Sequence, residues 1–310
     1  MTIIISTQNH LICQGGINKF IIDYSSKLSK HQFITRDNPR LPHKINGDVN
    51  ILKILKKINP SEVHIHSVLD STRYHGLINL FKMNKFKVVY YCHSLINEEI
   101  EHSDEKNIYH QEKLLGQEEL FEKADKVIFF NNWQRNECIK KYPYITTKSI
   151  VKYHTTDKTF SKKIKTDKIN ILYVGRLSLE KGILDLVNAY VQIENTQTNL
   201  MIIGALPGDS ILPQIIQSLK GTNYNIINWK NSKKELEKYY NLASLVVLPS
   251  HYDSFNMVGI ESLKHGIPLL VSDIPVFKEI YSKKENVHQF KSKSSSDLSK
   301  KLKIFLNKLN

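Results

Sequence analysis

Short apolar segments alternate along this chain with longer segments in which apolar residues recur every three to four positions. A short apolar run has the length of a buried strand, whereas the longer period is that of an amphipathic helix. This alternation predicts parallel sheets flanked by helices. The predicted strands lie near Thr2–Ser6, Gln32–Thr35, Val63–His66, Lys87–Tyr91, Val127–Phe130, Ser149–Lys152, Asn170–Val174, Leu200–Ile203, Asn225–Trp229, Leu245–Leu248 and Leu269–Val271.

The length of 310 residues predicts two domains, because a single hydrophobic core seldom grows this large. A polar, lysine-rich stretch at Asp157–Lys168 precedes the second series of strands and is the expected join. We therefore predict one doubly wound, Rossmann-like α/β domain over residues 1–160 and a second over residues 161–310. Ligands of such sheets bind beyond the carboxyl ends of the strands, so we expect the domains to face each other across a cleft that holds the site.

The composition is that of a globular protein, with 41% hydrophobic and 24% charged residues. No apolar run approaches the ~20 residues of a membrane span, and the N-terminus begins as a strand rather than as a signal peptide. The three cysteines, Cys13, Cys92 and Cys138, match no metal or disulfide pattern. We therefore expect a reducing, cytoplasmic setting.

The formal net charge of +14 favours an anionic partner, namely a nucleic acid, an acidic membrane surface or a phosphorylated substrate. The alternative is a set of lysines spread over solvated faces. The sequence contains no zinc knuckle and no aromatic RNA-binding signature, so we expect no nucleic-acid partner. Lys53, Lys56 and Lys57 lie on a predicted helix that is compatible with peripheral contact with an anionic membrane. The alternative, which we favour, is an ordinary packed helix with solvated lysines.

The strand predicted to end at Val174 runs into a turn that holds two cations, Arg176 and Lys181, between Gly175 and Gly182. Two cations beside the N-terminus of a helix suit a diphosphate, and flanking glycines allow the backbone to approach closely. The alternative is a surface turn with two solvated cations.

A second polar loop follows the strand that ends at Leu248, and a helix begins near Met257. The backbone N–H groups of Asn256, Met257 and Val258 would be available at that helix start, for a phosphate or a sugar hydroxyl. Asp253 could accept from sugar hydroxyls, and Glu261, about one turn into the helix, from a ribose. The alternative is an N-capping loop with an acidic first turn.

These motifs together resemble the retaining glycosyltransferases of family 4, which have the GT-B fold. The resemblance rests on Gly-Arg, four residues and Lys-Gly, then on Asp, seven residues and Glu, then on the stretch His265–Asp273. It implies that Arg176 and Lys181 bind the diphosphate of a nucleotide sugar. It further implies that Asp253 contacts the donor sugar and Glu261 the ribose.

The first half of the chain resembles the same family more weakly. Gly15 and Gly16 resemble a glycine pair that approaches donor and acceptor, and His93 resembles a histidine beside the reacting sugar. The stretch Ala124–Gln134 resembles the last strand and helix before the interdomain join. We expect His64 and His66 to point to opposite faces of their strand, and therefore not to chelate one metal ion.

The sequence departs from the family pattern at several positions. Asp253 stands where the family usually has Glu, and Ser254 and Asn256 replace the usual glycines near Phe255. The stretch His154–Asp157 stands in place of an Asn-Gly pair, and the chain ends soon after its last predicted helix. The departure at Asp253 puts donor choice in question, and those at Asp253 and Asn256 keep open a non-catalytic donor-binding protein.

The resemblance implies transfer of a sugar to a hydroxyl of a glycan or glycolipid acceptor, such as a lipid-linked, polysaccharide or lipopolysaccharide precursor, at the inner face of the cytoplasmic membrane. No acidic pair in the motifs suits a metal clamp, so we expect no divalent ion. The alternatives are a sugar-nucleotide epimerase or hydrolase of the same fold, and a basic binding protein without catalysis. The expected catalytic residues are His93, Arg176, Lys181 and Asp253, and the expected donor-binding residues are Gly15, Gly16, Arg176, Lys181, Asp253, Phe255, Asn256, Met257, Val258 and Glu261.

Overall fold

The chain forms two compact units in a computed structural model: an N-terminal unit of residues 1–101 and 105–154, and a C-terminal unit of residues 102–104 and 155–310. The structure describes residues 2–6, 21, 24–28, 31–35, 48–66, 77–102, 108–153, 164, 166–193, 197–230, 233–282 and 284–308. The predicted domain boundary at residue 160 lies outside the described residues, as does most of the predicted join, so both stay predictions.

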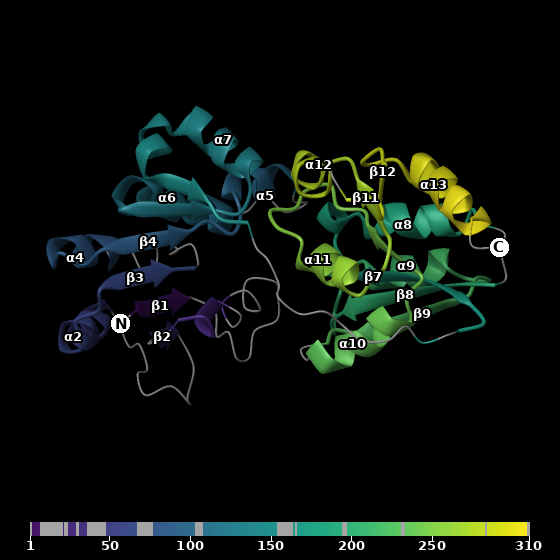
Figure 1. The fold of residues 1–310 in the computed structure, drawn as a ribbon, viewed down its shortest axis with the longest axis horizontal. Helices are drawn as coiled ribbons and strands as arrows, with labels where there is room; N and C mark the ends of the chain where they lie inside the picture. Colours follow the sequence, from purple (N-terminus) through teal and green to yellow (C-terminus); the bar gives the residue numbers. More distant parts are fainter. Residues whose placement is uncertain are drawn as a thin grey trace. The chain divides into compact units, whose positions relative to one another are not determined.

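The N-terminal unit holds a six-stranded sheet in the order β2-β1-β3-β4-β5-β6, in which every pair is parallel (Figure 1). Its strands are β1 (Thr2–Ser6), β2 (His31–Thr35), β3 (Glu62–Ile65), β4 (Val88–Tyr91), β5 (Lys126–Phe129) and β6 (Ser149–Val151). The helices of this part of the chain are α2 (Asp48–Ile58), α4 (Leu77–Met83), α5 (Ile96–His102), α6 (Ile108–Lys123), α7 (Asn132–Lys141) and the 3-10 helix η1 (Pro143–Lys148).

One face of this sheet carries a large hydrophobic cluster. Alternate strand residues such as Val63 and Ile65 pack there against side chains from α2, α4, α6 and α7. In α2, Leu55 is buried in that cluster while Lys53, Lys56 and Lys57 are exposed. This is the arrangement of an ordinary packed helix with solvated lysines. Contact of those lysines with a membrane stays a prediction.

The C-terminal unit holds a second six-stranded parallel sheet, in the order β12-β11-β10-β7-β8-β9 (Figure 1). Its strands are β7 (Ile169–Val174), β8 (Thr198–Ala205), β9 (Tyr224–Asn228), β10 (Leu245–Leu248), β11 (Leu269–Ser272) and β12 (Val287–Phe290). Its helices are the 3-10 helix η2 (Leu179–Lys181), α8 (Ile183–Tyr190), α9 (Leu212–Ser218), α10 (Lys233–Leu242), α11 (Met257–Lys264), α12 (Pro275–Tyr281) and α13 (Ser295–Asn307).

Both sheets confirm the predicted parallel α/β architecture, and each predicted strand matches an observed one to within a few residues. The sequence did not predict β12. Its two central residues, His288 and Gln289, are polar, so the strand is not an apolar run. Only Phe290 among its residues is buried, because an edge strand is covered less fully than a central one. At α13, the hydroxyl of Ser294 accepts the N–H of Asp297 at 3.2 Å and caps the helix. None of the helices in the described part of the chain is long and apolar enough to cross a membrane.

Candidate active site

The order of strands in the C-terminal unit reverses between β7 and β10, which lie side by side. The chain proceeds from β7 outward to β8 and β9, then returns through α10 to β10 and continues on the other side to β11 and β12. In such sheets, ligands bind beyond the carboxyl ends of the strands at the switch point. Both predicted motifs, Gly175–Gly182 and Pro249–Asn256, are the loops that follow β7 and β10.

The loop after β7 owes its path to Gly182, which ends η2 and begins α8 with a left-handed φ of 66°. A Cβ at this position would lie 1.9 Å from the carbonyl oxygen of Pro249 in the loop after β10. Only glycine therefore allows the two loops to pack this closely. The N–H of His251 also donates to the carbonyl oxygen of Glu180 at 2.8 Å, which links the same loops.

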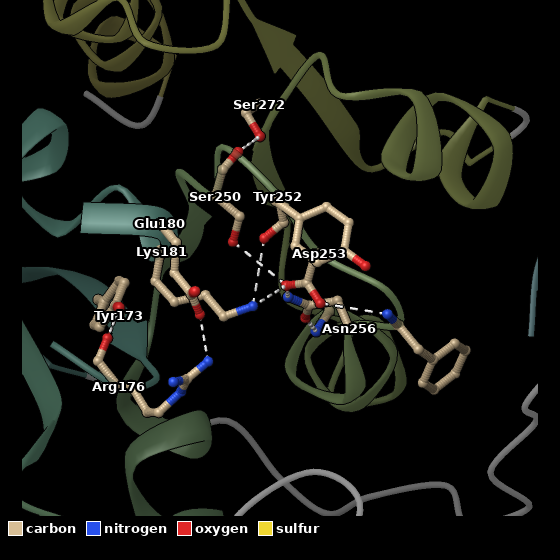
Figure 2. Close-up of polar contacts among 11 residues, drawn as sticks. Tyr173, Arg176, Glu180, Lys181, Ser250, Tyr252, Asp253, Asn256 and Ser272 are labelled. Atoms are coloured by element: carbon tan, nitrogen blue, oxygen red, sulfur yellow. Dashed lines mark hydrogen bonds and ion pairs between the residues drawn. The ribbon is translucent and has the colours of Figure 1, made fainter. Parts of the chain in front are cut away.

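Arg176 extends into solvent from the loop after β7, with 61% of its side chain exposed, and its guanidinium pairs with the carboxylate of Glu180 (Figure 2). The carbonyl oxygen of Arg176 accepts a hydrogen bond from the buried Tyr173 hydroxyl at 2.5 Å. The backbone of the arginine is thus anchored while its side chain is accessible to a ligand.

Lys181 points across to the other loop. Its Nζ lies 3.2 Å from Oδ2 of Asp253 and donates to the carbonyl oxygen of Tyr252 at 3.4 Å (Figure 2). The Asp253 side chain is 7% exposed and that of Lys181 22%. An ion pair this sheltered from water is screened less than a surface pair.

The start of α11 is capped by Asn256, whose Oδ1 accepts the N–H of Gly259 at 2.7 Å. The N–H groups of Met257 and Val258, at the first two positions of the helix, have no intrahelical acceptor. Phe255 directs its N–H to Oδ1 of Asp253 at 3.3 Å.

Glu261 lies one turn into α11 and is buried, at 4% exposure. Its Oε2 accepts a hydrogen bond from the Tyr240 hydroxyl of α10 at 2.9 Å. Burial, and after it the charge of Glu261, raises the pKa of Tyr240 well above its ordinary value, so this hydroxyl stays a donor.

The structure adds residues that the sequence did not predict. Nε2 of His251 lies 2.6 Å from Oδ2 of Asp185 in α8, and the Ser295 hydroxyl of α13 donates to Oδ1 of Asp185 at 3.1 Å. Burial works to raise the pKa of Asp185, but the hydrogen bond with His251 and the charge of that ring hold it below its ordinary value. No sequence motif connects these residues, because each comes from a different element.

In the N-terminal unit, His93 follows β4 and its Nε2 lies 3.1 Å from Nδ1 of His66. The His93 ring stacks on Phe130 with centroids 4.9 Å apart. Burial, and after it the neighbouring His93 and His64, holds the pKa of His66 well below its ordinary value, so this ring is neutral. Gly15 and Gly16 lie outside the described residues.

The expectation that His64 and His66 point to opposite faces of β3 is wrong. Both rings lie against Tyr24 and Tyr91, with His66 stacked on Tyr91 at 4.2 Å. The reason is the two-residue period of a strand, which places residues two apart on the same face and sends the intervening Ile65 into the core. Both ring nitrogens of His64 are occupied by hydrogen bonds: Nδ1 lies 2.8 Å from the Tyr24 hydroxyl, and Nε2 lies 2.8 Å from the Glu62 carboxylate. Across the described residues, no group of three or more His, Cys, Asp or Glu side chains could hold a metal ion.

A family model described as Glycosyl transferases group 1 matches residues 155–309, half of the chain. An uncharacterised 41.2 kDa protein in the cps region of Klebsiella pneumoniae is 25% identical over 247 residues, which are 75% of this chain and 65% of that protein. The lipopolysaccharide 1,2-N-acetylglucosaminetransferase of Salmonella typhimurium is 26% identical over 233 residues, 72% of this chain and 58% of that enzyme. The chain therefore spans less than two thirds of the length of these relatives.

Two solved structures share the fold along the whole chain. The sucrose-phosphate synthase from Thermosynechococcus elongatus has a TM-score of 0.82 at 18% identity, over 99% of this chain and 89% of that one. HepE from Anabaena, in complex with UDP and glucose, has a TM-score of 0.79 at 14% identity, over 99% of this chain and 90% of that one. The predicted class of two Rossmann-like domains, the GT-B fold, is confirmed.

Proposed function

Because the chain belongs to the group 1 glycosyltransferases, we propose that it transfers a sugar from a nucleoside-diphosphate sugar to an acceptor hydroxyl. One observation carries the proposal. The side chains of Arg176 and Lys181 both project from the loop after β7, at the switch point of the C-terminal sheet. The neighbouring loop, after β10, leads into the N-terminus of α11.

The diphosphate is the part of the donor that this arrangement suits best. When the bond to the sugar breaks, negative charge grows on the departing phosphate, and preorganised cations and N–H groups stabilise such charge. Arg176 would reach the diphosphate from its exposed position, and Lys181 from beside Asp253. The N–H groups of Met257 and Val258 would add donors, and Glu261 would accept from the ribose.

The proposed chemistry retains the anomeric configuration. The acceptor oxygen would bond to the anomeric carbon on the face that the nucleotide leaves. The bond from that carbon to the phosphate oxygen would break, with its electron pair and the acceptor proton passing to the diphosphate. His93, whose ring is held by His66 and Phe130, would position the sugar by a hydrogen bond to its primary hydroxyl. None of these steps uses a divalent ion.

The acceptor is proposed by analogy with a relative. Because the Salmonella enzyme is by name a lipopolysaccharide sugar transferase, we infer a glycan or glycolipid acceptor from polysaccharide or lipopolysaccharide assembly at the inner face of the cytoplasmic membrane. The structure of HepE contains UDP, which makes UDP-sugars the first donors to test.

A thermal-shift screen of UDP-, GDP-, ADP- and TDP-sugars tests donor binding, because a ligand of the native state must raise its stability. Radiolabelled donor with and without acceptor then separates transfer from hydrolysis and epimerisation.

Arg176→Ala should lower kcat/KM by about 30- to 1,000-fold, the effect of losing ~2–4 kcal/mol of electrostatic stabilisation. Lys278→Ala is the matched control, since Lys278 is also an exposed cation paired with a carboxylate, that of Asp273. Equal turnover in the two variants would contradict the assignment of Arg176.

A further inference from the structure

The carboxylate of Asp253 is surrounded by donors from the protein itself (Figure 2). Oδ2 accepts from Asn256 Nδ2 at 2.9 Å and from the Ser250 hydroxyl at 3.4 Å, and it pairs with Lys181 Nζ at 3.2 Å. Oδ1 accepts the N–H of Phe255 at 3.3 Å. A carboxylate offers about four lone-pair sites, so most of this acceptor capacity is used within the two loops.

Asn256 connects this carboxylate to α11. Its Oδ1 caps the helix by accepting from Gly259, while its Nδ2 donates to Asp253. A single chain of contacts therefore runs from the first turn of α11 through Asn256 and Asp253 to Lys181 on the other loop. The two central residues of this series, Asp253 and Asn256, are largely buried, with whole-residue exposures of 5% and 9%.

We propose that Asp253 and Asn256 are positioning residues that hold Lys181 and the start of α11 in place for the donor diphosphate, and that Asp253 is not a ligand of the donor sugar. The inference rests on the proposed function. It follows from the direction of the carboxylate, which meets Lys181, Asn256 and the loop backbone. A group that only held the loops would affect any ligand with a diphosphate, with or without a sugar.

The experiment compares two ligands of the same protein. Isothermal titration gives the Kd of a nucleoside diphosphate and of its sugar nucleotide, using the pair that binds best among UDP, GDP, ADP and TDP. If Asp253 positions Lys181, a change at Asp253 should weaken both ligands by the same factor. If Asp253 bound the sugar, only the sugar nucleotide would be weakened.

Two variants break the chain of contacts without changing its charge. Asp253→Glu keeps the carboxylate but displaces it by one methylene, and Asn256→Ser keeps a helix cap of similar strength but removes the donor to Asp253. Each should raise both Kd values by about tenfold, as for the loss of a hydrogen bond to a charged group. The Kd values of the double variant should exceed those of the more affected single variant by no more than about twofold, because both substitutions break the same linkage.

Asp273→Glu is the control, because Asp273 likewise accepts a backbone N–H, that of Ser292, and pairs with Lys278. It should leave both Kd values unchanged, and a binding stoichiometry near one reports that each variant is folded. A loss in Asp253→Glu confined to the sugar nucleotide would overturn the inference, as would wild-type affinity in both variants. Failure of the wild-type protein to bind any of these nucleotides would instead overturn the proposed function, and the inference with it.

Discussion

Replacing Gly182 by alanine should force apart the two loops that form the candidate active site. The new Cβ would lie 1.9 Å from the carbonyl oxygen of Pro249, where ordinary contact begins at 3.4 Å, so one backbone must move by about 1 Å or more. The residue would also keep a left-handed φ of 66°, which costs a non-glycine residue ~1–2 kcal/mol. Forced overpacking adds ~1–3 kcal/mol, partly offset by ~0.4–1 kcal/mol from the less flexible unfolded chain.

The expected loss in unfolding free energy is therefore about 2–4 kcal/mol, measured by urea denaturation. Gly221→Ala is the matched control, because Gly221 also has a left-handed φ, 83°, but none of the described atoms lies within 4 Å of its Cβ site. It should lose only about 1 kcal/mol. Gly182→Ala should also weaken nucleotide binding, since a displacement near 1 Å is enough to disturb a site. Equal destabilisation by the two substitutions would refute the close approach of the loops.

Three further outcomes are expected. Burial lowers the pKa of both His64 and His66 in the folded protein, so below about pH 6.5 the unfolded chain binds more protons than the folded one. The unfolding free energy should therefore fall with decreasing pH, by up to ~1.4 kcal/mol per pH unit for each histidine. In His66→Asn, the dependence of the unfolding free energy on pH should be less steep. Tyr240→Phe removes the hydrogen bond to the buried Glu261 carboxylate and should cost ~1.5–3 kcal/mol in urea denaturation. Tyr239→Phe, at the half-buried neighbouring position of α10, should cost little. Transferase activity should survive EDTA treatment; its loss, with recovery on adding Mg²⁺ or Mn²⁺, would contradict the proposed mechanism without a metal.

Much of the fold could be predicted from local patterns. Central strands such as β7 and β10 are nearly continuous apolar runs, because a parallel sheet covered on both faces demands them. Helices such as α11 could be predicted from the preceding polar loop and a suitable N-cap residue. The edge strand β12 lacks that pattern, since it is half exposed, and so the sequence did not predict it.

In the candidate site, too, local motifs predicted the residues but not their contacts. Arg176, Lys181, Asp253 and Glu261 could be proposed from motif spacing and the family resemblance. The partners of these side chains could not, because Lys181 meets Asp253 only when β7 and β10 become neighbours.

The sequence by itself determined the elements, their parallel arrangement and the residue types available at the switch point, since these depend on period and spacing. The tertiary structure decided the direction of each side chain. It brought His66, after β3, next to His93, after β4, and it turned the Asp253 carboxylate toward Lys181 and Asn256. The physical reason is that hydrogen-bond partners are set by distances in space, and strand order, not proximity in the sequence, sets those distances.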